Sequence, residues 1–537
     1  MKKLITLFAA VLLYTAAGAQ AAKIVYSDPI EIPAVGYNKL LQVRNGNTLL
    51  LHFEPYKGIV LKVFDKSHKE IASQKHTCEI VDINALNQAD FKGLFDINGE
   101  AVLFIQQPYL SRMSLMRLRI DANTGKLLKE EVVERAPTFK NETIFYVQQF
   151  SGKDQYAILH YKNLAFMPDE KIKISIWSSK NEKLREVSID KPFEELHTMR
   201  YNGFNAEKDA IYACFSLYIQ IADGQFKQYL YNARLNENDT ACSLQKVEID
   251  DRIPSYFSVF TPNEFAETEN MMAMNMYSTE EKVGENKETA YFPVPYFFSF
   301  AKSDFSVASS SVIEEDKINE KTAGMRDTMT PSAWIPLRMH TSKTGASAVF
   351  YEMQHDYFKH EKGKDFHQTY LGHLAVNILN DNGSSVFCLV IPKKQVLYSL
   401  YEAEDLSRRN TTRHLFRDMA AEDHYSQFAS FEVLPVKGNY HILVNDLVEN
   451  FDRKITDTLN AVTNFDYSNA ICYTLNRKRE LTKSYLFGTP AAGEAKPCQL
   501  ESANYNESTG LYAVVMQEYA NNKTSIKIAW CQFDPSI

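Results

Sequence analysis

The sequence predicts an all-β protein, and three observations support that class. Tyr (30 residues) and Phe (33 residues) are abundant, and Val, Ile and Leu recur in short runs that alternate with polar residues. Such alternation is typical of β-strands with one buried face. Polar turns rich in Asp, Asn, Ser and Gly separate the runs. A unit of strand, turn and strand recurs along the chain, which indicates a repeat architecture.

The repeat is defined by the apolar residue that ends a strand just before each polar turn. Eight residues hold this place: Phe64, Ile120, Trp177, Leu235, Phe300, Leu379, Leu475 and Phe533. Their successive separations are 56, 57, 58, 65, 79, 96 and 58 residues, so three units carry insertions. In the second unit, "FKGLFDI" (91–97) and "EAVLFIQQ" (100–107) precede this pair of strands. Each unit therefore predicts four antiparallel strands.

A chain of such four-stranded units resembles the β-propeller superfamily over essentially its whole length after residue 19. We expect eight blades, with seven blades as the alternative, in one domain over residues 20–537. No particular family is matched, because the repeated signatures of WD, kelch and sialidase propellers are missing. The stretch "DANTGKLL" (121–128) resembles one repeat of the quinoprotein propellers, but it occurs once. We therefore expect no cofactor.

The two ends of the chain predict how the ring closes. The eighth unit stops at Phe533 and the few residues after it, so it lacks a fourth strand. The stretch "KIVYSDPIEIP" (23–33) precedes the first unit and has no place in it. A closed ring needs no exposed sheet edge at the junction. We therefore expect residues 23–33 to form the outer strand of the blade that contains Phe533.

The first residues predict export. "MKKLITLFAAVLLYTAAGAQ" has two lysines, an apolar run and small residues that end at Ala19, which is the pattern of a secretory signal peptide over residues 1–19. Its apolar run is shorter than the roughly 20 residues that span a bilayer, and no later run is longer. We expect a periplasmic or secreted protein without membrane insertion.

Charge and cysteine content exclude further classes. The formal net charge is −8, and loss of Lys2 and Lys3 leaves 57 basic against 67 acidic residues, or −10. An acidic chain has no electrostatic reason to bind nucleic acid or anionic lipid. The seven cysteines form no CxxC motif. We expect buried, unreactive thiols on strands, with Cys214 and Cys242 as the candidate disulfide pair.

The insertions predict a functional face. In a propeller, the turns between second and third strands and the connections between blades open on one face, which we call the top face. The insertions that fall at such places are 278–289, 319–334, 355–373, 398–425 and 446–467. Residues 398–425 have a partial apolar stripe and are expected to be helical. Long loops on one face of a rigid scaffold often carry function; neutral variation in loop length is the alternative.

Second strands repeatedly end in a tyrosine beside polar groups, which predicts a ring of tyrosines on the top face. The tyrosines are Tyr56, Tyr109, Tyr161, Tyr218, Tyr277 and Tyr519. A tyrosine can stack on a sugar or peptide and still offer a hydroxyl group. Packing between blades is the alternative role. Acidic residues predicted for the same face are Glu54, Asp446, Glu449 and Glu518, of which we include Glu54 and Glu518 in the ligand site.

The stretch "HDYFKHEKGKDFHQTYLGH" (355–373) holds four histidines and raises the question of a metal site. We expect an extended hairpin with its tip near Gly363. A register that pairs residues summing to 726, or one shifted by a residue so that His360 meets His367, leaves one histidine roughly 13 to 20 Å from the others at 3.3 Å per residue. Zinc needs three or four ligands at about 2.1 Å. We therefore expect no metal here.

Two functions follow from these observations. The first is an exported, non-enzymatic propeller that binds a glycan, peptide or protein on its top face. The alternative is a propeller glycoside hydrolase or polysaccharide lyase that uses top-face carboxylates. The sequence contains no HExxH, GxSxG, P-loop or GxGxxG motif. A pair of carboxylates at catalytic separation would favour the enzyme, and a broad aromatic surface would favour binding.

Overall fold

A computed structural model describes most of the chain from residue 22 to residue 533. The residues in that span that it does not describe are 33–35, 55–56, 137–142, 163–171, 190–196, 221–225, 250–256, 262–267, 282–287, 302, 305, 314–315, 326–332, 343–345, 362–363, 400–423 and 521–522. The predicted signal peptide, residues 1–19, also lies outside the described residues.

The first half of the described chain forms four antiparallel sheets of four strands each. Sheet 1 consists of β2 (Tyr37–Gln42), β3 (Thr48–Glu54), β4 (Gly58–Phe64) and β5 (Glu70–His76). After the 3₁₀ helix η1 (Ile83–Gln88), sheet 2 consists of β6 (Asp90–Ile97), β7 (Glu100–Tyr109), β8 (Arg112–Ile120) and β9 (Leu127–Arg135). Sheet 3 consists of β10 (Thr143–Gln149), β11 (Tyr156–Lys162), β12 (Ile172–Trp177) and β13 (Lys183–Ile189). Sheet 4 consists of β14 (His197–Ala206), β15 (Ala210–Gln220), β16 (Phe226–Asn236) and β17 (Ser243–Ile249).

The second half follows the same plan with additions. Sheet 5 consists of β18 (Phe257–Thr261), β19 (Thr268–Glu281), β20 (Glu288–Ala301) and β21 (Val307–Val312). Sheet 6 consists of β22 (Ala333–Thr341), β23 (Ser347–Glu361), β24 (Lys364–Leu379) and β25 (Ser385–Ile391), and a fifth strand, β26 (Gln395–Ser399), pairs with β24. Sheet 7 consists of β27 (Phe431–Val436), β28 (Asn439–Asp446), β29 (Asn469–Leu475) and β30 (Leu481–Tyr485). Sheet 8 consists of β31 (Cys498–Asn506), β32 (Leu511–Ala520), β33 (Lys523–Phe533) and β1 (Ala22–Tyr26).

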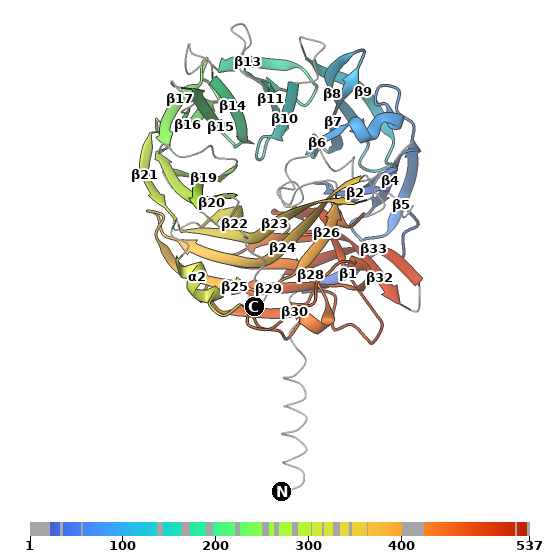
Figure 1. Ribbon diagram of the computed structural model, residues 1–537. Coiled ribbons are helices and arrows are strands. Elements are labelled where there is room, and N and C mark those ends of the chain that lie inside the picture. The colour runs from blue at the N-terminus through green and yellow to red at the C-terminus, as the bar shows by residue number, and fades with distance from the viewer. Residues whose placement is uncertain are drawn as a thin grey trace.

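The sheets are arranged as a ring around one axis (Figure 1). The first strand of a sheet contacts the first strand of the next one, as for β2 with β6, β6 with β10 and β31 with β2. First strands are therefore innermost and fourth strands outermost. The predicted class is confirmed: the protein is an all-β propeller with four-stranded antiparallel blades.

The predicted pairing of the two ends is confirmed. β1 pairs antiparallel with β33, with Ala22 opposite Phe533 and Tyr26 opposite Ala529. Two backbone bonds continue the pairing beyond β1, from Ser27 N to Ile528 O (2.9 Å) and from Ile30 N to Ile526 O (2.8 Å). The N-terminal strand thus completes sheet 8.

The residues that marked the repeat all lie at the end of a third strand, or within one residue of it, in eight different sheets. Each is buried, with 8% exposure or less. The following turn starts with a polar side chain in several units: Asp65 Oδ1 accepts from Ser67 N and Lys69 N, and Asp121 Oδ1 accepts from Asn123 N and Thr124 N. These local bonds favour a turn over continued strand, which explains why the pattern is visible in the sequence.

The core lies between neighbouring sheets. One cluster joins Leu51, Phe53 and Leu61 of sheet 1 to Leu103 and Leu118 of sheet 2, all with 1% exposure or less. Burial of such a side chain contributes roughly 1.5–3 kcal/mol.

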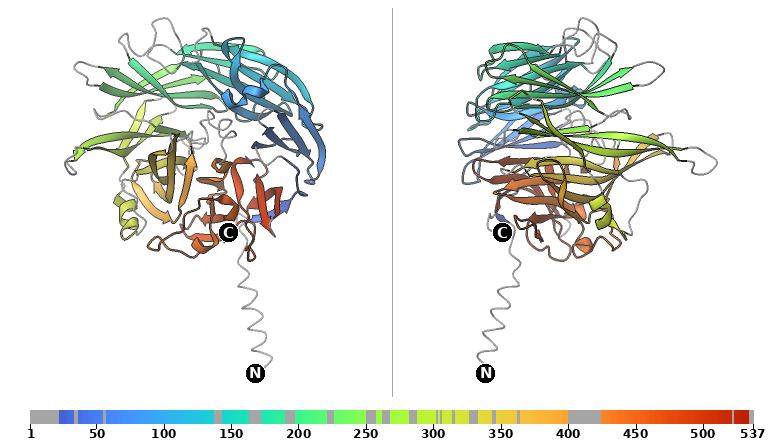
Figure 2. Two further views of the ribbon diagram at one scale, coloured as in Figure 1. Left: turned by 45° about the vertical axis from the view of Figure 1, so that its right-hand side comes forward. Right: turned by 90° about the vertical axis from the view of Figure 1, so that its left-hand side faces the viewer.

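The described α-helix lies in a segment for which the sequence predicts no helix. The described α-helix is α2 (Asp316–Thr322), which begins just before the predicted insertion 319–334. The predicted helical insertion 398–425 has its residues 400–423 outside the described part, while β26 and the 3₁₀ helix η3 (His424–Phe428) flank them. Two second-to-third-strand hairpins, β19–β20 and β23–β24, are longer than those of the other sheets and extend from the ring (Figure 2).

The candidate disulfide is not formed. Cys214 has a free thiol and is 1% exposed. Cys472 and Cys531 also carry free thiols inside the core. Burial raises the pKa of the Cys472 thiol to about 12, so that it stays protonated and unreactive at neutral pH. This agrees with the expectation of buried thiols on strands.

Candidate functional site

A pocket lies on the face opposite the predicted one. We call it the Arg44 pocket. It has a volume of about 510 Å³, within the range of roughly 300–1,000 Å³ usual for small-ligand sites. Its lining comes from the inner ends of four sheets: Gln42, Arg44, Phe95, Asp96, Gln149, Phe150, Ser151, Gly152, Lys153, Asn506 and Ser508. These residues end first strands or form the turns to second strands, so the pocket opens on the bottom face at the inner edge of the ring.

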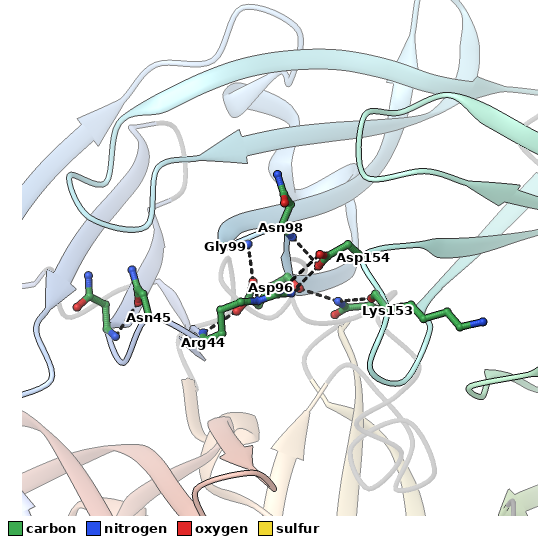
Figure 3. Close-up of polar contacts among 9 residues, drawn as sticks. Arg44, Asn45, Asp96, Asn98, Gly99, Lys153 and Asp154 are labelled. Atoms are coloured by element: carbon green, nitrogen blue, oxygen red, sulfur yellow. Dashed lines mark hydrogen bonds and ion pairs between the residues drawn. The ribbon is translucent and has the colours of Figure 1, made fainter.

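Arg44 joins three sheets across this pocket (Figure 3). Its Nε donates to Asp96 Oδ1 at 3.1 Å, and its Nη2 donates to Asp154 Oδ1 at 2.5 Å. Its Nη1 also reaches Asp154 Oδ2 at 3.2 Å, so the guanidinium binds Asp154 through two nitrogens. The planar fork of arginine suits such paired contacts. One side chain from the β2–β3 turn therefore holds the end of β6 and the β10–β11 turn in place.

The backbone of these turns reinforces the same contacts. Arg44 N donates to Asp96 Oδ2 at 2.6 Å, and Asn98 N donates to Asp154 Oδ1 at 2.7 Å. Asn45 Nδ2 donates to Asn123 Oδ1 at 3.1 Å, which adds a tie from sheet 1 to the β8–β9 turn (Figure 3). The turns that surround the pocket are thus held by bonds between sheets, and a site of this kind is largely preformed.

Two further walls are built from amide side chains. Gln42 Nε2 donates to Asn504 O at 2.8 Å and to Leu511 O at 2.9 Å, which joins sheet 1 to sheet 8. Gln149 Nε2 donates to Asp96 O at 2.6 Å and to Lys153 O at 3.2 Å, which joins sheet 3 to sheet 2. Each amide is oriented by these bonds.

The charges of the Arg44 pocket are compensated within the protein. The Arg44 guanidinium lowers the pKa of the Asp154 carboxyl below its ordinary value, and the backbone N–H of Asn98 adds to the effect. Hydrogen bonds to Asp154 and Asp96 raise the pKa of Arg44. Lys153 Nζ forms an ion pair with Glu237 at 2.7 Å. Arg44 is 51% exposed, whereas Asp96 and Asp154 are 16% and 35% exposed, so the arginine faces solvent more than its partners do.

The predicted tyrosines are only in part within the described residues. Tyr56 and the side chains of Tyr218 and Tyr277 lie outside them. Tyr161 is 1% exposed and its hydroxyl donates to Met199 O, so it packs between sheets 3 and 4. Tyr109 is partly buried with the guanidinium of Arg135 5.5 Å from its ring centre.

Tyr519 and the two predicted acids form separate polar groups. The Tyr519 hydroxyl bonds to Asp466 and lies 2.7 Å from Gln517 Oε1. Glu518 pairs with Lys527 at 2.6 Å. Glu54 is 5% exposed and pairs with Lys57 at 2.5 Å. Burial alone would raise the pKa of Glu54, but Lys57 and Lys75 outweigh it, and the pKa is lowered. A ligand role for these residues stays a prediction.

A buried charged network lies on the top side, between sheets 6 and 7. Lys393 Nζ and Glu352 Oε1 are 2.7 Å apart, and both side chains are 0% exposed. Lys393 Nζ also donates to Leu371 O and to Gln395 Oε1, at 3.0 and 3.1 Å. Glu352 Oε2 accepts from Gln354 Nε2 and from Ser430 Oγ, both at 3.0 Å. This network is well bonded and holds the two sheets together.

Asp446, at the end of β28, is 2% exposed. Burial raises its pKa to about 6, although hydrogen bonds from Asn450 and from Leu447 N oppose the shift. Such a carboxyl can hold a proton near neutral pH. Its pKa thus moves in the opposite direction to that of Glu54, the other buried acid predicted for the top face.

The histidine hairpin has a register that differs from both predicted ones. His355 pairs with Tyr370, and Phe358 pairs with His367, so paired residues sum to 725. A register shift between Glu352 and Gln354 causes the difference. His373 is buried, and its Nδ1 accepts from Lys393 N at 3.1 Å. Within the described residues, no three His, Cys, Asp or Glu side chains are placed to hold a metal ion.

Sequence reasoning missed the Arg44 pocket, although a signal was present. In four sheets the last residue of the first strand, or the one before it, is polar (Gln42, Asp96, Gln149 and Asn506), and a glycine follows three or four residues later. These glycines have φ between +67° and +90°, which only glycine adopts without strain. A polar residue followed by such a glycine, repeated in four units, marks this edge of the ring.

No protein family and no curated protein sequence matches the chain. Solved structures resemble it only distantly. A prolyl endopeptidase shares 8% identity at a TM-score of 0.36, covering 90% of this chain and 55% of that one. A post-proline cleaving enzyme from Rickettsia typhi shares 10% sequence identity at a TM-score of 0.34, and the match covers 91% of this chain and 58% of that one. A polysaccharide lyase shares 8% sequence identity at a TM-score of 0.35, and the match covers 86% of this chain and 93% of that one.

The chain thus spans little more than half the length of the first two of these proteins. Likenesses at such scores carry no argument about function. Fold and site therefore define the class: an all-β propeller with a pocket at the inner edge of its ring. In the described part of the chain, no helix is long and apolar enough to cross a membrane.

Proposed function

We propose that the protein is an exported, non-enzymatic propeller that binds a glycan, peptide or protein, and that the ligand occupies the Arg44 pocket. The observation that supports this most is the pocket itself: about 510 Å³, lined by four sheets whose positions are fixed by hydrogen bonds between them. The N-terminal signal pattern supports a periplasmic or secreted location.

The state of the carboxylates favours binding over catalysis at this pocket. A glycosidase acid needs a raised pKa so that it can donate a proton near neutral pH. Asp154 has a lowered pKa because Arg44 and Asn98 bond to it. Asp96 is also bound to Arg44 at 3.1 Å. These two carboxylates serve to hold the arginine.

Blocking the pocket tests the proposal. Ser151 is exposed in the β10–β11 turn and lines the pocket, so Ser151→Trp should fill part of it. Ser67 is equally exposed in the β4–β5 turn, and Ser67→Trp is the matched control. Both proteins are screened with the parent chain against arrays of glycans and peptides. The S151W protein should lose ligands that the S67W protein keeps. Equal binding by all three proteins would contradict the proposed site.

A top-face hydrolase or lyase is the second candidate, and Asp446 is the observation in its favour. Its pKa of about 6 suits a general acid. Glu449, another predicted acid, lies in η4 (Val448–Asn450), which follows Asp446 directly. If the enzyme reading holds, Asp446→Asn should abolish release of reducing ends from polysaccharides. Unchanged release by this variant, or none by the parent chain, would remove the candidate.

We also propose that each of the eight sheets is one blade of a closed ring, with seven blades as the alternative. The eight marker residues in separate sheets and the pairing of β1 with β33 support eight. A density map viewed along the ring axis would decide the count.

A further inference from the structure

We infer that the Arg44 pocket takes an uncharged saccharide. This rests on the proposed function and narrows it to one ligand class. The first argument is electrostatic. Arg44 is bound by Asp96 and Asp154, so an anionic ligand would have to compete with two carboxylates already in place. A cationic ligand would have to displace the arginine from them. Breaking such charge-assisted bonds is costly, so the site favours a ligand without charge.

The groups that a ligand could use include an aromatic ring, an amide oxygen as acceptor and an amide nitrogen as donor. Phe95 lines the pocket and is partly exposed, with its ring centre 6.0 Å from that of Phe104. Gln149 uses its amide nitrogen within the protein, which leaves its amide oxygen as an acceptor. Asn506 Oδ1 accepts from Ser508 N at 3.0 Å and from Ser508 Oγ at 2.6 Å, which leaves its amide nitrogen as a donor.

This combination suits a sugar ring. One face of a pyranose presents C–H groups that stack on an aromatic ring, and its hydroxyl groups both donate and accept hydrogen bonds. The exposed hydroxyl of Ser151 adds a group that can do either. An extended peptide would need a series of pockets for its alternate side chains, whereas this site is one pocket with one partly exposed aromatic ring, that of Phe95. The pocket therefore matches a neutral sugar better than a peptide.

The test uses Asn506→Asp and Phe95→Leu in the full chain. N506D keeps the oxygen that the turn needs but replaces the donor with a negative charge. F95L keeps an apolar side chain but removes the ring. Asn380 Oδ1 accepts from Ser384 N at 2.9 Å in the β24–β25 turn, so Asn380→Asp repeats the same change away from the pocket. The probes are neutral gluco-, galacto-, manno- and xylo-oligosaccharides, uronic acid oligomers, and blocked neutral peptides, measured by calorimetry.

At least one neutral oligosaccharide should bind to the parent chain. N506D and F95L should each weaken its affinity about tenfold or more, while N380D should leave that affinity unchanged. Affinity should change less than about twofold between roughly 0.05 and 0.5 M salt, because no net charge is engaged. Binding of peptides or uronic acids, but not neutral sugars, in an N506D-sensitive manner would overturn the inference and keep the proposed function. If no probe binds in an N506D-sensitive manner, the inference and the proposed pocket fall together.

Discussion

The buried pair of Lys393 and Glu352 gives the sharpest test of the structure. Lys393→Met removes the cation and leaves Glu352 charged, and Glu352→Gln does the reverse. Both side chains are 0% exposed and their charged atoms are 2.7 Å apart. A charge left alone in such a place has no solvent to replace its partner.

The expected loss follows from this burial. Removing one partner of a buried ion pair costs about 3–5 kcal/mol in the free energy of unfolding. Unfolding entropy is about 2.1 cal/mol/K per residue, so a chain of 537 residues that unfolds as a unit should lose about 1 °C in Tm per kcal/mol. Each single variant should therefore melt about 3–5 °C lower. The double variant should lose less than the sum of the two, by about 0.5–3 kcal/mol.

The assay is thermal unfolding followed by tryptophan fluorescence, since Trp177, Trp334 and Trp530 are all buried. The control is Lys173→Met, which removes a partner of an exposed pair, Lys173 with Glu186, at 43% and 34% exposure. Exposed pairs contribute about 0–1 kcal/mol, so this variant should shift Tm by less than about 1 °C. If the Lys393 and Glu352 variants also shift Tm by less than that, or if the double variant is fully additive, the assignment of a coupled buried pair is refuted.

Three further predictions concern other parts of the ring. A chain that begins at Tyr37 lacks β1 and should melt at least about 5 °C lower, because it loses hydrogen bonds between strands worth roughly 0.5–1.5 kcal/mol each. A peptide of residues 22–32 should restore part of the lost Tm, and a scrambled peptide should not. An unchanged Tm would contradict the pairing of β1 with β33. Asp446 has a pKa raised from 3.8 to about 6 in the folded protein. Its contribution to the free energy of unfolding is therefore complete below pH 3.8 and is lost as pH rises through 6. The Asp446→Asn variant should therefore gain in Tm relative to the parent chain as pH rises from 4 to 7, and a difference independent of pH would count against the shift. Replacing Tyr109 and Tyr519 by Ala should weaken any ligand bound on the top face with little change in Tm, while a much lower Tm would show that they pack between blades.

The fold was predictable because its signals are local. Phe64, Ile120 and several other markers end third strands because an Asp, Asn or Ser beside them bonds to the backbone of the next turn. The sequence also shows that the eighth unit lacks its fourth strand and that residues 23–33 lie outside the first unit. β1 pairs with β33 as expected. The helix Asp316–Thr322 was missed, because seven residues are too few to show a helical period.

The candidate site was less predictable because it depends on contacts over long sequence distances. Arg44 meets Asp96 and Asp154, which are 52 and 110 residues away. Nothing in the local sequence of any of the three specifies the others. The hairpin register also depended on a shift near Glu352, which alternating patterns do not reveal. Conspicuous insertions directed attention to the top face, whereas the pocket is built from short and regular turns.

The pairing of Ala22 with Phe533 has a consequence for how the chain folds. β1 and β33 lie about 500 residues apart in the sequence, so the edge of β33 that β1 covers stays unpaired until both strands are in place. Long-range pairing of this kind is slow, because the chain must close a loop of almost its whole length. Until then the ring has a gap that exposes unpaired backbone, the state in which β-rich chains aggregate. Pairing of β1 with β33 is therefore the step that covers this edge.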